Sequence, residues 1–146
     1  FFADLAPVYL DLIAGCGRNV VFRAGQYAFR EGEAAERFYL LRAGAVALEV
    51  HAPGRAPLTI ETLHPGEVLG VSWLIAPYRW NFDARALEDT RAVALDAVCL
   101  RGKADADPAL GYALMQRFVP EVVRRLQATR LRLLDLYGPP ADAPRA

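Results

Sequence analysis

The chain has 146 residues, of which 54% are hydrophobic and 23% are charged, as is typical of one globular domain. Its 17 basic and 17 acidic side chains cancel, which excludes a whole-chain field that would attract nucleic acid or an anionic membrane. No apolar run approaches the roughly 20 residues of a membrane-spanning helix, and no signal-peptide pattern is present. We therefore expect a cytoplasmic location.

The predicted elements begin with a short helix within residues 1–16. One face carries apolar side chains at helical spacing, namely Leu5, Val8, Tyr9, Leu12 and Ile13. From residue 20 to about 96 the chain changes to short apolar segments separated by glycines, which predicts a β-sandwich or barrel. Within it, residues 45–50 and 58–62 alternate apolar and polar side chains around a Pro/Gly-rich turn, which predicts a hairpin.

The C-terminal part, after Asp107, has a helical pattern. Apolar or small side chains recur there at alternating spacings of four and three, namely Met115, Val119, Val122, Leu126, Thr129, Leu133 and Leu136. Such a heptad seam is typical of a coiled coil and predicts a homodimer. A broader apolar stripe would instead indicate packing on the chain's own β region.

Pro120 lies inside this pattern. Its missing N–H and its ring disfavour a continuous helix, so we expect two helices, 108–118 and 120–137, with a hinge at Pro120. The chain then divides into an N-terminal helix with the β region (1–107), the C-terminal helices (108–138) and a disordered Pro/Ala tail (139–146).

The two cysteines, Cys16 and Cys99, are far apart in sequence. They have no CxxC spacing and no neighbouring histidine cluster. We therefore interpret them as two buried free thiols.

Three glycine-bounded segments carry a family resemblance: Gly25-Gln-Tyr-Ala-Phe-Arg-Glu-Gly32, Phe38-Tyr-Leu-Leu-Arg-Ala-Gly44 and His64-Pro-Gly-Glu-Val-Leu-Gly70. Each glycine separates two strands, where a tight or left-handed backbone is needed. In this order the segments resemble the cyclic-nucleotide-binding domain family. The resemblance implies a mainly β fold with helices, a double-stranded β-helix (jelly-roll) barrel with a short N-terminal helix and a C-terminal helical arm. It also implies a ligand-sensing regulatory function.

Members of that family hold the cyclic phosphate in a short helical cassette. Helix N-terminal amides and an Arg bind the phosphate, and a Glu accepts a hydrogen bond from the ribose. The matching stretch here is 69–86, in which Val71 stands where the family has Glu and Trp80 where it has Arg. Neither contact can be made in the family's manner. Arg79 either replaces the missing Arg after a one-residue shift of the loop or has a structural, solvent-facing role.

The cassette still offers a candidate ligand site. Its residues are Gly70, Val71, Ser72, Trp73, Arg79, Trp80, Asn81 and Phe82. Gly70 is expected to open the cassette helix. Two interpretations stay open: a cyclic nucleotide or another small ligand stacks on Trp80, or the aromatic side chains fill this space and no ligand binds.

Other chemistry is not indicated. His51 and His64 have no metal-ligand spacing, and Ser72 lacks the Gly-x-Ser-x-Gly context of a nucleophile, so we expect no metal, no cofactor and no enzymatic activity. DNA binding by this chain alone is also not expected. We predict a dimeric, non-enzymatic small-ligand sensor. The alternatives are a ligand-free interaction or scaffold domain that dimerises, and the sensor half of a transcription regulator without its DNA-binding module.

Overall fold

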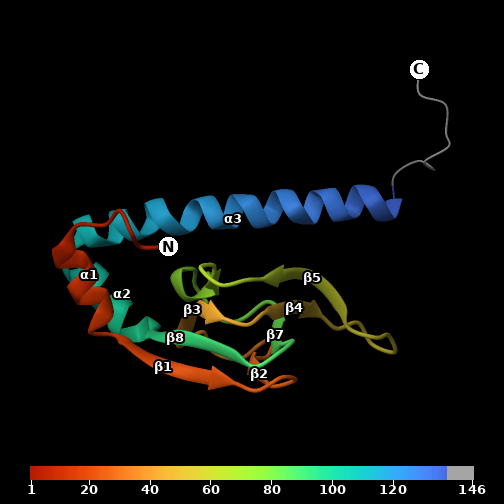
Figure 1. The fold of residues 1–146 in the computed structure, drawn as a ribbon. Coiled ribbons are helices and arrows are strands. Elements are labelled where there is room, and N and C mark those ends of the chain that lie inside the picture. The colour runs from red at the N-terminus through yellow and green to blue at the C-terminus, as the bar shows by residue number, and fades with distance from the viewer. Residues whose placement is uncertain (138–146) are drawn as a thin grey trace.

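The structure, a computed structural model, describes residues 1–137 except the side chains of 132, 133 and 135–137; the predicted tail, 139–146, lies outside this range. The helices of the described part are α1 (Pro7–Ala14), the 3-10 helix η1 (Ser72–Leu74), α2 (Ala97–Ala106) and α3 (Pro108–Tyr137). Its strands are β1 (Gly17–Phe22), β2 (Tyr27–Phe29), β3 (Arg37–Ala43), β4 (Val46–Val50), β5 (Leu58–Leu63), β6 (Val68–Leu69), β7 (Asp83–Ala86) and β8 (Thr90–Asp96) (Figure 1).

The strands form two four-stranded sheets, in the orders β1-β8-β3-β6 and β2-β7-β4-β5. Every pairing within them is antiparallel. Side chains of both sheets, such as Phe38 and Leu41 from one and Val46 and Leu48 from the other, meet in one buried cluster. The predicted mainly β fold is confirmed, although the described strands make two sheets and not a closed barrel.

The predicted hairpin is confirmed as β4 and β5, paired from Val46 with Leu63 to Val50 with Leu58. Leu48 lies directly opposite Glu61, and the register shifts after this pair, between Leu48 and Glu49. Directly paired residues project from the same face of a sheet. Glu61 therefore lies on the face that carries the core residue Leu48.

The helices differ in part from the prediction. Helix α1 is shorter than expected and begins at Pro7, which is favoured in a first turn; Val8, placed on its inner face by the sequence pattern, is exposed. Helix α2 was not predicted. Its N-terminus is capped by Asp96, whose carboxylate accepts a 2.9 Å hydrogen bond from the N–H of Cys99.

Helix α3 runs without a break through Pro120, so the prediction of two helices is wrong. Proline removes one intrahelical hydrogen bond, to the carbonyl of Gln116. Both residues are exposed, so water can bind that carbonyl. Buried contacts on either side, at Phe118 and Arg125, hold the two halves in line. A hinge motion at Pro120 stays a prediction.

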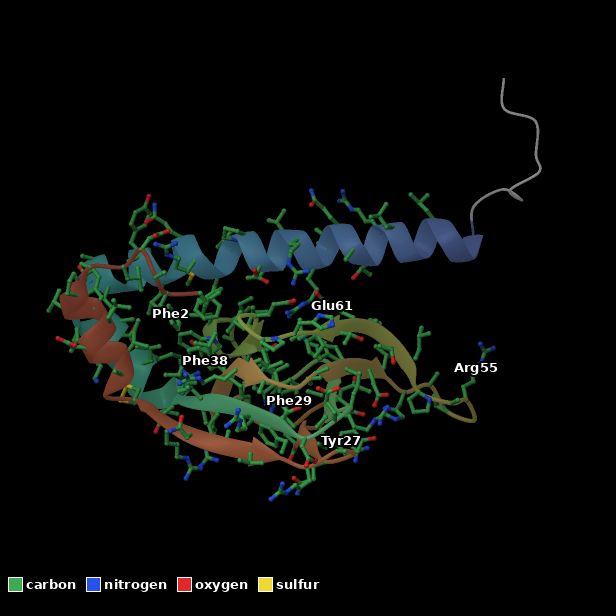
Figure 2. All side chains as sticks on the ribbon, in the orientation of Figure 1. Phe2, Tyr27, Phe29, Phe38, Arg55 and Glu61 are labelled. Atoms are coloured by element: carbon green, nitrogen blue, oxygen red, sulfur yellow. A yellow bond between two sulfur atoms is a disulfide. The ribbon has the colours of Figure 1, made fainter. Side chains whose placement is uncertain are left out.

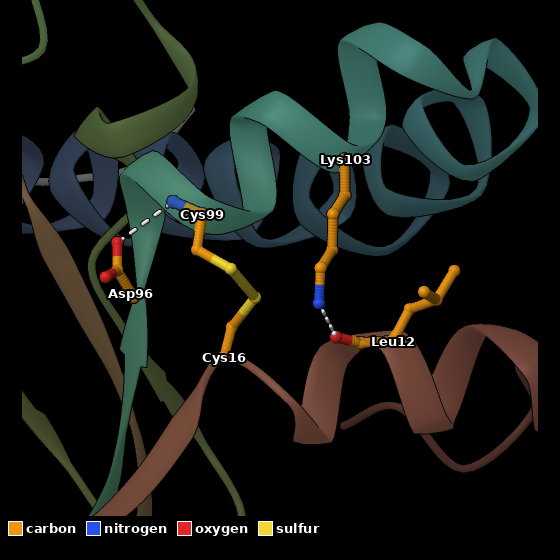
Figure 3. Close-up of a disulfide and its surroundings, with 5 residues drawn as sticks. All are labelled: Leu12, Cys16, Asp96, Cys99 and Lys103. Atoms are coloured by element: carbon orange, nitrogen blue, oxygen red, sulfur yellow. Dashed lines mark hydrogen bonds between the residues drawn. A yellow bond between two sulfur atoms is a disulfide. The ribbon is translucent and has the colours of Figure 1, made fainter.

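The prediction of free thiols is also wrong, because Cys16 and Cys99 form a disulfide (Figure 3). Pairing of β1 with β8 brings Cys16 to the start of α2, where its carbonyl accepts a 2.8 Å hydrogen bond from the N–H of Asp96. Lys103 adds a second link, since its Nζ donates to the carbonyl of Leu12 at 2.8 Å. The disulfide therefore ties the N-terminal segment to α2.

None of the helices in the described part is both long and apolar enough to cross a membrane.

Candidate functional site

The predicted cassette, 69–86, runs from the last residue of β6 through η1 to the end of β7. In place of the expected cassette helix, the structure has only the three-residue 3-10 helix η1, which Gly70 and Val71 precede. A single turn of this kind offers few aligned N–H groups. The prediction that Gly70 opens a cassette helix is therefore wrong, because only one 3-10 turn follows it.

Trp80 packs against Gly70. The backbone of Gly70 has φ +107°, and a Cβ at this position would lie 2.5 Å from Cη2 of the Trp80 ring. Trp80 is buried and stacks on Phe29 with a centroid distance of 3.7 Å and an interplanar angle of 7°. The Trp80 side chain is thus a packed part of the core.

Trp73 connects the cassette to α3. Its ring is buried and stacks on Phe38 of β3 at 4.4 Å. It also meets Phe118 of α3 edge-on, with the ring centroids 5.2 Å apart. Figure 2 shows Phe38 inside the domain, below the helix. Motion of η1 would therefore change the packing of α3.

A second contact joins α3 to β5 through charged side chains. Glu61 accepts a 3.0 Å hydrogen bond from Nε of Arg125 and a 2.7 Å hydrogen bond from Nη1 of Arg124. Figure 2 shows Glu61 beneath α3. Hydrogen bonding to Glu61 is the main cause that raises the pKa of Arg124. This cluster anchors the middle of α3 to the sheet.

The comparison with known sequences decides the family. The sequence model of the family "Cyclic nucleotide-binding domain" matches residues 19–107, more than half of the chain. This chain belongs to the cyclic nucleotide-binding domain family.

Relatives within this family include bacterial transcription regulators. The "CRP-like cAMP-activated global transcriptional regulator" of Mycobacterium tuberculosis is 27% identical over 92% of this chain and 58% of the regulator. Among solved structures, a putative cyclic nucleotide-binding protein from Geobacter metallireducens has a TM-score of 0.77 at 32% identity, covering 86% of this chain and 90% of that one. The catabolite activator protein of Thermus thermophilus has a TM-score of 0.71 at 27% identity, covering 92% and 62%.

These findings place the chain as a cyclic nucleotide-binding regulatory domain related to CRP-type transcription regulators. The chain spans less than two thirds of the length of the curated regulators it matches first. The resemblance proposed from the sequence is confirmed at the level of family and fold.

The two departures from the cyclic nucleotide-binding pattern have different surroundings. Val71 is half-buried and packs against the core, and it has no polar atom in its side chain. Trp80 is held by its backbone, since its N–H donates to the carbonyl of Glu33 at 3.0 Å and its carbonyl accepts from the N–H of Gly32 at 2.8 Å. This pairing fixes the register of the loop.

Arg79 follows the structural alternative. Its Nη1 donates a 2.9 Å hydrogen bond to the carbonyl of Gly32, and its backbone forms a bridge with Ala34. The side chain is exposed. In this geometry Arg79 ties the cassette loop to the turn after β2.

The other predicted site residues do not converge on one space. Ser72 is buried in η1, Asn81 is exposed, and Phe82 is half-buried near Phe29, at a centroid distance of 6.1 Å. A pocket of about 240 Å³ adjoins Trp80 and is lined by Ala28, Phe29, Glu33, Ala34, Glu36, Arg37, Tyr39 and Trp80. This volume lies below the range of about 300–1,000 Å³ usual for ligand sites.

Sequence reasoning missed two buried carboxylates near this region. Asp83 is 5% exposed and pairs with His51 and Arg30. Glu49 is 2% exposed and binds Arg85 through two hydrogen bonds of 3.0 and 2.9 Å, which chiefly cause the raised pKa of Arg85. Within the described residues no group of His, Cys, Asp and Glu side chains could hold a metal ion.

Sequence reasoning also missed Glu61 and Arg125. In the sequence, Glu61 is a polar residue of an alternating strand, and Arg125 is a charged residue beside the heptad seam. The signal that could have revealed Arg125 is its position on the helix, seven residues after Phe118 and therefore on the same face.

Proposed function

We propose that this chain is a non-enzymatic regulatory domain that senses a small ligand at the cassette and transmits the ligand state to α3. The contact of Trp73 with Phe118 carries the proposal. Because interiors are close-packed, displacement of η1 would move α3 and with it the heptad seam. The predicted cytoplasmic location and absence of a cofactor stay predictions.

The proposed ligand is held without the phosphate and ribose contacts of the family. Val71 supplies no acceptor and the buried Trp80 supplies no charge. We therefore expect cyclic AMP and cyclic GMP to bind weakly. A ligand with an apolar or heterocyclic part suits the aromatic cassette better.

The proposed partner is a second copy of this chain. Four residues of the predicted seam are exposed apolar side chains: Met115, Val119, Val122 and Leu126. An exposed apolar stripe on a helix indicates an interaction surface. Thr129 is exposed too, while the side chains of Leu133 and Leu136 lie outside the described ones.

Calorimetric titration with cyclic AMP and cyclic GMP, together with a thermal-shift screen of metabolites, tests the sensor proposal. We expect at least one metabolite to raise the unfolding temperature and both cyclic nucleotides to bind weakly. Val71→Glu restores the carboxylate of the family and should strengthen cyclic nucleotide binding, while Val98→Glu on the exposed face of α2 should not. A chain that responds to no compound would contradict the proposal.

A ligand-free interaction domain that dimerises is the second candidate, favoured by the stacking of Trp80 on Phe29. This arrangement fills space next to Gly70 with the chain's own aromatic ring. The third candidate is the sensor part of a transcription regulator, supported by the relatives that are longer than this chain. Failure of the ligand screen with an intact dimer would favour the second candidate.

A further inference from the structure

Arg125 is a buried charge with unpaired donors. The residue is 8% exposed, and its Nη1 and Nη2 are buried without a hydrogen-bond partner. A buried donor left unpaired costs about 1–3 kcal/mol, and more when the group is charged. Buried polar groups nearly always have a hydrogen-bond partner, so these two nitrogens are open to a water molecule or a ligand group.

Neither oxygen of the nearest carboxylate reaches these two nitrogens. Glu61 binds Nε of Arg125 with Oε2 and Nη1 of Arg124 with Oε1. The edge of the Arg125 guanidinium formed by Nη1 and Nη2 is therefore left over. This planar edge matches the two oxygens of a carboxylate or phosphate.

The surroundings of this edge include an aromatic ring. The guanidinium carbon of Arg125 lies 5.7 Å from the centroid of Phe82, the residue before β7. The Phe82 ring therefore offers an apolar surface next to the charged group.

We propose that Nη1 and Nη2 of Arg125 bind an oxoanion group of the ligand, a carboxylate or a phosphate, between α3 and the β5–β7 side of the domain, with the rest of the ligand against Phe82. This inference rests on the proposed ligand-sensing function. It places the anion on the helical arm and not in the cassette. Because both nitrogens are buried, the ligand enters only when α3 moves locally from β5, and binding therefore selects one position of the arm.

Two probes and three variants test the site in the whole chain. Inorganic phosphate and benzoate are titrated at constant ionic strength against chloride, and the affinity is taken from the rise in unfolding temperature. Arg125→Gln removes the charge and the planar guanidinium edge. Arg125→Lys keeps the charge but not the planar edge. Arg124→Gln is the matched control, because it removes the same charge from the adjacent residue that shares Glu61.

We expect the wild-type chain and Arg124→Gln to bind at least one probe. Both Arg125 variants should bind the probe at least tenfold more weakly. If Arg125→Gln does not unfold cooperatively, Arg125→Lys alone gives the comparison. The probe that binds distinguishes a phosphate from a carboxylate. Absence of binding to the wild-type chain, or equal binding by Arg125→Lys, overturns the inference. A metabolite response that persists in Arg125→Lys would overturn this inference alone and leave the sensor function standing.

Discussion

At the scale of single residues, Gly70 in the cassette has both a strained backbone and no room for a side chain. Its φ is +107° and a Cβ would meet the Trp80 ring, whereas Gly32 has φ +87° with open space around the position of a Cβ. Backbone strain is common to both positions, and overpacking is added only at Gly70.

Gly70→Ala should therefore destabilise the chain by about 1–3 kcal/mol more than Gly32→Ala does. Urea unfolding of both variants measures the difference. Equal losses would mean that the Trp80 ring moves aside at no cost.

Tyr39 carries a pH dependence. Burial raises the pKa of its phenol, against the opposing effects of Arg37 and Arg18. Because the folded-state pKa lies above the unfolded one, the stabilisation is complete below the ordinary tyrosine pKa of about 10 and is lost as the pH rises through the folded-state value.

Tyr39→Phe should weaken the fall in unfolding free energy between about pH 9 and about pH 11. The measurement is urea unfolding across this range. Tyr112→Phe, at an exposed position, is the control and should leave the fall unchanged. An unaltered profile in Tyr39→Phe would contradict the assignment.

At the scale of elements, the attachment of α3 to β5 depends on a nearly buried ion pair. The side chains of Arg125 and Glu61 are 10% and 12% exposed, whereas those of Arg124 and Glu121 are 44% and 23% exposed. Removing one member of a buried pair leaves a charge without its partner, and solvent screens the more exposed pair.

Glu61→Gln should cost about 3 kcal/mol of unfolding free energy, and Glu121→Gln less than about 1 kcal/mol. Urea unfolding compares the two variants. A loss at Glu61 no larger than that at Glu121 would mean that apolar packing alone holds the helix.

The disulfide joins the turn before β1 to α2 across 83 residues of sequence. Cys16→Ser should lower stability by about 2–5 kcal/mol under non-reducing conditions, and a reductant should lower the unfolding temperature of the wild-type chain but not of the variant. Alkylation of both cysteines in the unreduced wild-type chain would contradict the bond.

At the scale of the whole molecule, the two long faces of α3 have different partners. The inner face, which includes Leu110, Leu114, Phe118 and Arg125, packs on the chain's own domain, while Val119 and Leu126 are 51% exposed. A helix that keeps a second apolar face exposed is typical of an interaction between chains.

Leu126→Glu should convert a dimer into a monomer, since it places a charge in the apolar seam. Light scattering at tens of micromolar protein measures the mass. Val8→Glu, at an exposed position of α1, is the matched control and should leave the dimer intact. A monomeric wild-type chain would contradict the prediction that the chain dimerises through the heptad seam.

Local patterns in the sequence were enough to predict the β region, the β4–β5 hairpin and the helical C-terminal part. Alternation, helical spacing and glycines at turns act over a few residues, so they can be recognised without a structure. The family resemblance rests on the same local segments.

Only the tertiary structure determined the features that depend on residues distant in sequence. It joined Cys16 to Cys99, buried Trp80 against Gly70, carried α3 through Pro120, and paired Arg125 with Glu61, 64 residues away. The physical reason is that strand register and close packing decide which distant side chains meet and which buried donors stay unpaired.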